Sequence, residues 1–267
     1  MSERMPVVFV SHGAPDAVLN AADTVDCWRE LGRQIPLPSA ILVISAHWEA
    51  NRPTVSLSGA PPTIHDFSGF SPALHRIRYP APGAPALAER VVALLSDAGV
   101  AADTHPSRGL DHGAWVPLTA MYPEAQVPVT QLALVRNAGA AAHVALGQAL
   151  APLRDEGVLI LGSGAVTHNF DWLDWHADGE AAPFPQARQF SDWVGAHLAA
   201  QDGPAMLAYR SAPHGAEAHP SEEHFMPLYV ALGAADGDKP QRYQPRFTYG
   251  GLSMDAYVWR SALLRPA

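Results

Sequence analysis

Four of the thirteen histidines stand beside apolar runs, where they could share a metal ion. These four residues are His12, His47, His168 and His224. Neutral imidazole is the commonest metal ligand in proteins. Ligands of open α/β sheets bind outside the carboxyl ends of the strands. A single histidine at a strand end is more often structural. Two of them, His12 and His47, end separate apolar runs, and this favours a shared metal site.

The segment that begins at Leu110 contains another histidine that could take part in catalysis. His112 follows Asp111 and precedes Gly113. Adjacent residues rarely face each other, so Asp111 is not expected to orient His112. Two interpretations stay open: His112 is an acid/base group where a loop meets a helix, or Asp111 simply caps a helix N-terminus.

Two further segments carry weaker indications. Gly162, Ser163 and Gly164 follow an apolar run, but neither a dinucleotide-binding nor a P-loop pattern is complete, and the spacing of a nucleophile elbow is absent. Ser221 is expected to cap a helix that holds His224 at its third position. The neighbouring acidic pair at 222–223 would also favour that helix N-terminus through the macrodipole.

These residues require a scaffold, and the apolar pattern predicts one. Buried strands are expected at residues 7–10, 41–45, 129–135 and 158–161, and helices at 23–31, 85–98, 140–153 and 186–200. Continuous apolar runs are typical of strands covered on both faces. The sequence therefore predicts a layered α/β fold with a central, mostly parallel or mixed sheet flanked by helices. Short edge strands are expected at 54–57, 77–79 and 246–249.

Composition narrows the classes of function. The chain has 267 residues, enough for a full core, and no convincing boundary divides it, so residues 1–267 are expected to form a single domain. A net charge of −9 without a basic stripe argues against a nucleic-acid partner. No apolar run is long enough to span a membrane, and the N-terminus lacks the apolar region of a signal peptide. We therefore expect cytoplasmic residence. The single cysteine excludes an intramolecular disulfide, and the apolar composition permits a homo-oligomer.

Taken together, these motifs resemble the class III extradiol aromatic ring-opening dioxygenases. The similarity is greatest to their DODA-type branch, the 4,5-DOPA extradiol dioxygenase-like proteins. The matching segments occur in the family's order, and they lie at residues 11–13, 45–48, 65–67, 110–113, 162–164, 168–169 and 220–228. The combination is far more specific than any one motif.

The resemblance implies roles for particular residues. His12 and His47 match the two N-terminal ligand histidines of the family. His224 stands where the DODA-type branch has a histidine. Many class III relatives use a glutamate as third ligand, so the preceding Glu223 is the alternative. His168 matches a metal neighbour in this branch and an acid/base group in other relatives. His112 matches the second acid/base histidine.

The implied chemistry is ring opening of a catechol by O₂ in a single catalytic domain. A facial triad on Fe(II) leaves positions open for a catecholate and O₂, and a nearby histidine can move the substrate proton. One Fe(II) or Zn(II) per chain is expected, because three histidines also suit Zn(II). Two alternatives are a zinc-dependent hydrolase and a non-catalytic, Memo-like metal-binding or interaction protein.

The substrate beyond the catechol ring is left open. His65, accompanied by aromatic residues, is expected to line the mouth of a pocket. Three arginines are candidates for recognising an amino acid substituent such as that of DOPA, namely Arg136, Arg154 and Arg210.

Overall fold

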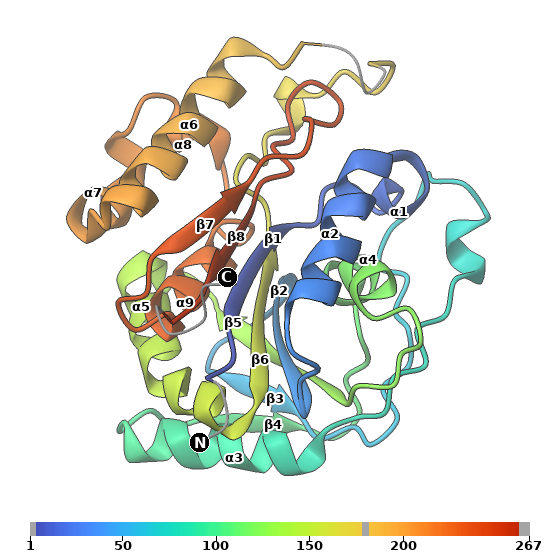
Figure 1. The fold of residues 1–267 in the computed structure, drawn as a ribbon, viewed down its shortest axis with the longest axis vertical. Helices are drawn as coiled ribbons and strands as arrows, with labels where there is room; N and C mark the ends of the chain where they lie inside the picture. The colour runs from blue at the N-terminus through green and yellow to red at the C-terminus, as the bar shows by residue number, and fades with distance from the viewer. Residues whose placement is uncertain (1–3, 178–181, 262–267) are drawn as a thin grey trace.

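Eight strands form one mixed sheet in the computed structural model, which describes residues 4–177 and 182–261 (Figure 1). Their order across the sheet is β4-β3-β5-β2-β6-β1-β8-β7. The strands are β1 (Val7–Ser11), β2 (Ala40–Ala50), β3 (Thr54–Ser56), β4 (Asp103–His105), β5 (Val129–Val135), β6 (Val158–Gly164), β7 (Pro240–Tyr243) and β8 (Ala256–Trp259). The central strands β5, β2, β6 and β1 run parallel, while β8 and β7 are added antiparallel. The prediction of a layered α/β fold with a mixed sheet is confirmed.

Helices cover both faces of the sheet. The α-helices are α1 (Ala17–Asn20), α2 (Ala22–Gln34), α3 (Pro85–Asp97), α4 (His112–Met121), α5 (Gly139–Leu150), α6 (Pro185–Ala200), α7 (Gly203–Leu207), α8 (Gly215–Ala218) and α9 (Met226–Ala234). The short 3₁₀ helices are η1 (Leu74–Arg76), η2 (Ala151–Glu156), η3 (Phe170–Trp172) and η4 (Tyr209–Ser211). Helices α1, α2 and α4 share a core with one face, and α3, α5, α6 and α9 share a core with the other.

The apolar strands supply both cores by simple alternation. Val7 and Phe9 of β1 pack into the core under α9, whereas Val8 and Val10 pack into the core under α2. All four side chains are fully buried. Because successive side chains of a strand point to opposite faces, a strand covered on both sides must be apolar throughout. Burial of each such side chain contributes roughly 1.5–3 kcal/mol.

The edges of the sheet differ most from the expectation. Strand β3 is present, but 77–79 and 246–249 are not strands. The Tyr79 amide binds the side chain of Thr63, and the second segment makes only an isolated bridge from Thr248 to Leu252. The short strands β4, β7 and β8 were not predicted. Among the described residues, no helix is long and apolar enough to cross a bilayer.

The strand register brings the carboxyl ends of three strands together. Ser11 of β1 pairs with Gly164 of β6, and Ser45 of β2 pairs with Ser163 of β6. The amide of His12 continues this pattern by donating to the Gly164 carbonyl at 2.9 Å. The sheet therefore delivers the first two predicted histidines to one edge.

Candidate metal centre and active site

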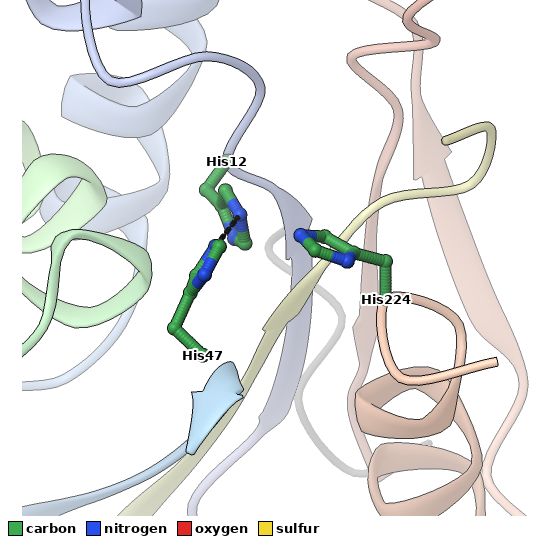
Figure 2. Close-up of side chains that lie close together, drawn as sticks. All are labelled: His12, His47 and His224. Atoms are coloured by element: carbon green, nitrogen blue, oxygen red, sulfur yellow. Dashed lines mark hydrogen bonds between the residues drawn. The ribbon is translucent and has the colours of Figure 1, made fainter. Parts of the chain in front are cut away.

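Three histidines from distant parts of the chain converge at this edge. One side-chain nitrogen from each of His12, His47 and His224 lies within 4.8 Å of the others (Figure 2). The Nε2 atoms of His12 and His47 are 3.0 Å apart. Two imidazole nitrogens bound to one ion at about 2.0–2.1 Å each would have a similar separation. The geometry of the trio therefore fits a single transition-metal ion.

The His12 ring is oriented by the strand beside it. Its Nδ1 lies 2.9 Å from the hydroxyl oxygen of Ser163, and this hydroxyl donates to the Gly113 carbonyl. Since the serine proton is already used, Ser163 accepts the Nδ1 proton of His12. The lone pair of His12 is thus on Nε2, the atom that faces His47. Fixing the tautomer through the second ring nitrogen is usual for metal-binding histidines.

The His224 ring is oriented by its neighbour Glu223. Its Nδ1 donates to the Glu223 carboxylate at 2.9 Å, which leaves Nε2 for the trio. His224 is not inside a helix, contrary to the expectation, because α9 begins only at Met226. Proline is favoured in the first turn of a helix, where it loses no hydrogen bond. Pro227 therefore belongs near the start of α9, and a helix beginning after Ser221 would have placed it in the interior.

His47 lies within strand β2, not at its end as expected. The register of β2 against β5 shifts between Ile44 and Glu49, and His47 falls in that irregular stretch. Such bulges redirect side chains and are common beside active sites. The His47 carbonyl accepts a hydrogen bond from Arg108 at 3.2 Å, and its amide donates to Ser45 Oγ at 3.2 Å.

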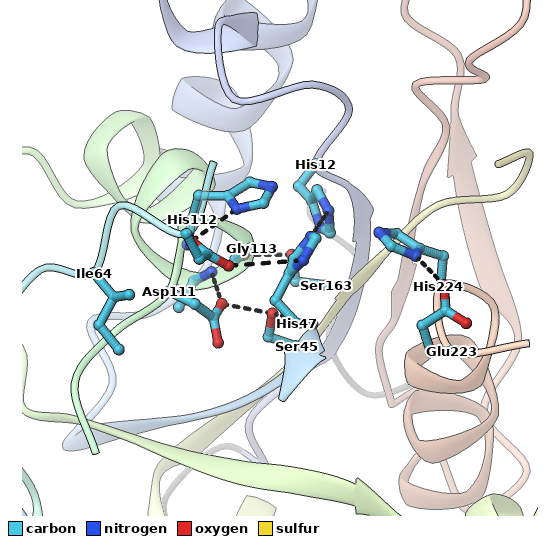
Figure 3. A network of polar contacts seen from close by, with 12 residues as sticks. His12, Ser45, His47, Ile64, Asp111, His112, Gly113, Ser163, Glu223 and His224 are labelled. Carbon is cyan, nitrogen blue, oxygen red and sulfur yellow. Dashed lines mark hydrogen bonds and ion pairs between the residues drawn. The ribbon is translucent and has the colours of Figure 1, made fainter. Parts of the chain in front are cut away.

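A buried carboxylate ties this bulge to helix α4. Asp111 is fully buried and accepts a hydrogen bond from Ser45 at 2.7 Å (Figure 3). It accepts another from Arg108 at 3.1 Å. It also accepts from the Ala114 amide, so it is the N-cap of α4, which was one of the two interpretations left open by the sequence. Asp111 does not bind the His112 side chain. The cap therefore positions both the bulge of β2 and the start of the helix that carries His112.

The partner of His112 is Asp66, a residue that the sequence did not single out. The Oδ1 atom of Asp66 lies 3.0 Å from His112 Nδ1 and 3.0 Å from the His112 amide. Burial alone would raise the pKa of Asp66, but the hydrogen bond from His112 and the nearby His47 together lower it to about 2. An ionised Asp66 holds the proton of His112 on Nδ1, so Nε2 is free to accept one.

His168 lies beside the trio. Its ring stacks on that of His224, with centroids 3.5 Å apart and planes 7° apart. It forms a second trio of possible ligands with Glu223 and His224, rather than with His12 and His47. His168 also lines the cavity in front of the cluster.

Burial keeps these imidazoles neutral. Desolvation, followed by the repulsion of neighbouring histidines, holds the pKa of His12 and of His224 well below the ordinary value. Desolvation is also the main cause that lowers the pKa of His47 to about 3 and of His168 to about 4. Neutral imidazole is the form that binds a metal, so no proton has to leave the cluster near pH 7.

A cavity of about 470 Å³ opens in front of the cluster. Its walls include His47, His112, His168 and His224. His65 is not part of the lining, contrary to the expectation. It packs behind Phe67, and its Nε2 lies 3.0 Å from the Ile77 carbonyl.

None of the three candidate arginines lines the cavity. Arg136 lies 4.0 Å from Glu49. Arg154 is fully buried, where it binds backbone carbonyls and Asp238. Arg210 donates to the His219 carbonyl. Each of the three thus has a protein partner outside the cavity.

The glycines at 162 and 164 permit close packing. A Cβ atom on Gly164 would lie 2.1 Å from the His224 carbonyl oxygen, and one on Gly162 would lie 2.5 Å from that of Pro227. The pair lets the segment that carries His224 rest directly on β6. Ser163 is fully buried and orients His12, so it is no exposed nucleophile.

Comparison with known proteins decides the family. The model of the catalytic LigB subunit of aromatic ring-opening dioxygenase matches residues 5–259. The chain belongs to this family. It is an extradiol ring-cleaving dioxygenase, an enzyme that cleaves catechols. Neither the hydrolase nor the non-catalytic alternative finds support in these matches.

Close relatives cover most of this dioxygenase. The 4,5-DOPA dioxygenase extradiol of Escherichia coli (strain K12) is 43% identical over 243 residues, which cover 90% of this chain and 88% of that protein. The protein of the same name from Beta vulgaris is 42% identical over 262 residues, covering 95% and 96%. The crystal structure of an uncharacterized protein from Escherichia coli K12 has a TM-score of 0.80 at 35% identity, covering 96% of this chain and all of that one.

LigB dioxygenases are non-haem metal enzymes, and the histidine cluster offers this one a site of suitable chemistry. Asp66 is the main residue that reasoning from sequence missed. It belongs to the His-Asp-Phe segment that contributed to the resemblance, so its motif was noted while its role was not.

Proposed function

We propose that His12, His47 and His224 hold one Fe(II) ion, and that the enzyme opens catechol rings there within a single catalytic domain. The convergence of the three imidazoles, with Nδ1 of His12 and of His224 engaged elsewhere, carries the assignment. Glu223 then orients His224 instead of binding the ion itself. Fe(II) is favoured over Zn(II) because O₂ chemistry needs a redox-active metal, and zinc is redox-inert.

An ion held by these three histidines would supply the redox chemistry with O₂. The chain's own residues would handle protons. His112 is suited to take a catechol proton on Nε2, since Asp66 holds its Nδ1 proton. The same group can return a proton to the ring-opened product. Substrate is therefore bound and deprotonated in one place.

His168 is the second proton-handling group in this proposal. It stacks on His224 and faces the cavity, and its pKa is lowered to about 4, so it is neutral when substrate arrives. A neutral imidazole there can accept a hydrogen bond from the second catechol hydroxyl. The aromatic walls beside it would exclude water from the reacting ring.

The relatives indicate the substrate class. Those named above are called 4,5-DOPA dioxygenases, and DOPA is a catechol. We propose a catechol substrate for this enzyme and O₂ as the second substrate. The same site would serve any catechol whose ring substituent fits the cavity.

The test is reconstitution without oxygen. The protein is loaded with Fe(II), mixed with catechol or L-DOPA and then exposed to air, while O₂ uptake and absorbance are followed. Stoichiometric O₂ uptake with a yellow product is expected. Protein loaded with Zn(II) and the His12→Ala variant are the controls, and both should be silent. An Fe(II)-loaded protein that takes up no O₂ with any catechol would contradict the proposal.

A further inference from the structure

The cavity beside the histidines is apolar apart from the histidines themselves. Its described walls contain only two other polar side chains, Ser68 and Asn169. The apolar side chains are those of Ala14, Pro15, Phe67, Phe70, Phe170, Leu173, Trp175 and Leu252. The chemistry of the wall away from the histidines is thus aromatic and aliphatic.

No charged side chain other than histidine belongs to the lining within the described ranges. Arg108, which approaches the cluster from behind, is held by the His47 carbonyl and Asp111. The Asn169 amide is also engaged, because it donates to the Glu217 carbonyl and accepts from the Asp171 amide. Among the described lining residues, a carboxylate placed here would find no partner with a fixed positive charge.

The segment that forms one wall has an acidic character. Asp171 and Asp174 are exposed on the same stretch that presents Phe170 and Trp175. The sequence from 169 to 187 contains no arginine or lysine. The negative charge of this segment is therefore a second reason why an anionic substituent is disfavoured.

The size of the cavity exceeds the needs of a catechol ring. Pockets of several hundred Å³ are typical of sites for ligands of drug size. Elsewhere in the lining, the ring centroids of Phe70 and Trp175 are 6.3 Å apart with planes at 69°, and the ring of Trp175 lies 4.8 Å from that of Tyr249. Aromatic side chains in such arrangements favour contact with a further ring.

We propose that the substrate is a catechol with an uncharged, ring-containing substituent, which lies against Phe70 and Trp175. This rests on the proposed function and narrows it. An anionic substituent would face Asp171 and Asp174 without an arginine or lysine among the described lining residues, so we expect catechols with an acidic substituent to be poor substrates of this enzyme.

A matched pair of compounds tests the proposal. 4-Phenylcatechol and 4-(4-carboxyphenyl)catechol differ only in one carboxylate. We expect kcat/KM to be higher for the neutral compound by about tenfold or more. A difference of this size is expected when the carboxylate of the other compound lacks one good polar contact. Equal values, or a preference for the acid, would overturn the proposal.

Calorimetry separates this proposal from the proposed function. Binding of both compounds to the metal-loaded protein is measured under argon, where no turnover occurs. If no catechol is turned over in air, the proposed function fails, and calorimetry still decides the preference. Tighter binding of the neutral compound would support the inference, and equal binding would overturn it.

A pair of variants places the substituent. Phe170 lies at the cavity wall and is 65% exposed, so the fold tolerates a change there. Phe170→Arg should reduce the preference for the neutral compound, because it adds a cation to the wall. Phe170→Gln, the matched uncharged control, should retain the preference. An unchanged preference in Phe170→Arg would show that the substituent lies elsewhere and would overturn its assignment to this wall.

Discussion

The Nδ1 atom of His12 lies 2.9 Å from the hydroxyl of Ser163, although 151 residues separate the two. That hydroxyl donates its own hydrogen bond to the Gly113 carbonyl at the start of α4. One buried serine thus joins β1, β6 and α4. Its position turns the lone pair of His12 toward His47, where a metal can use it.

Removing this hydroxyl should weaken the metal site without removing a ligand. We expect Ser163→Ala to bind Fe(II) or Zn(II) about tenfold to a hundredfold more weakly, the usual cost of losing a partner of a metal-binding histidine. Competition with a chelator of known affinity measures the change. Ser39→Ala, on an exposed loop, is the control. Equal affinities would mean that Ser163 does not orient His12.

Asp66 should affect turnover far more than metal binding. Asp66→Asn keeps the shape of the side chain but no longer fixes the His112 proton on Nδ1, so His112 adopts the wrong tautomer for accepting a proton. We expect kcat to fall by about a hundredfold or more, as for a lost acid/base group. Metal content by elemental analysis should be unchanged.

The control for that variant is Asp103→Asn, on the exposed strand β4. It should retain full kcat and full metal content. If Asp66→Asn empties the metal site, Asp66 is a ligand and not the partner of His112.

The central sheet was predictable from the sequence because strands that are buried on both faces form continuous apolar runs. The run 158–161 is continuously apolar, and β6 begins at its first residue. The edge strand β4 shows no such pattern, because its three residues are exposed. Strand β8 is buried and apolar throughout, but its run has only four residues, and it pairs with β1 and β7 where the chain returns to the sheet. That pairing is decided by tertiary contacts far along the chain.

The site was partly predictable for a related reason. His12 could be assigned because the end of a parallel strand has a defined place. The contact between Asp66 and His112 spans 46 residues, and a loop of irregular structure places the carboxylate. Local pattern cannot reveal such a contact. The expectation for His65 was wrong because it assigned to the cavity a ring that packs behind Phe67.

Gly164 should be essential to the placement of His224. An added Cβ would lie 2.1 Å from the His224 carbonyl oxygen, so one of the two backbones must move. We expect Gly164→Ala to lower the free energy of unfolding by about 1–3 kcal/mol, as overpacking does, and also to weaken metal binding. Urea denaturation and chelator competition measure the two effects.

Gly59→Ala, where nothing lies within 4 Å of the new atom, should change neither. A variant that loses stability but keeps full metal affinity would show that His224 adjusts freely.

The buried histidines make the stability of the metal-free protein depend on pH. Burial lowers the pKa of His168 from 6.5 to about 4 and that of His47 to about 3. As pH falls through 6.5, the unfolded chain binds protons that the folded chain does not. Stability is therefore full above pH 6.5 and decreases toward pH 4. His168→Gln removes one such group, so its free energy of unfolding should fall less steeply over this window. Urea denaturation in the presence of a chelator, at steps between pH 7 and pH 4, measures both slopes.

His105→Gln, on the exposed strand β4, is the surface control. Parallel curves for the wild type and His168→Gln would show that His168 is protonated equally in both states.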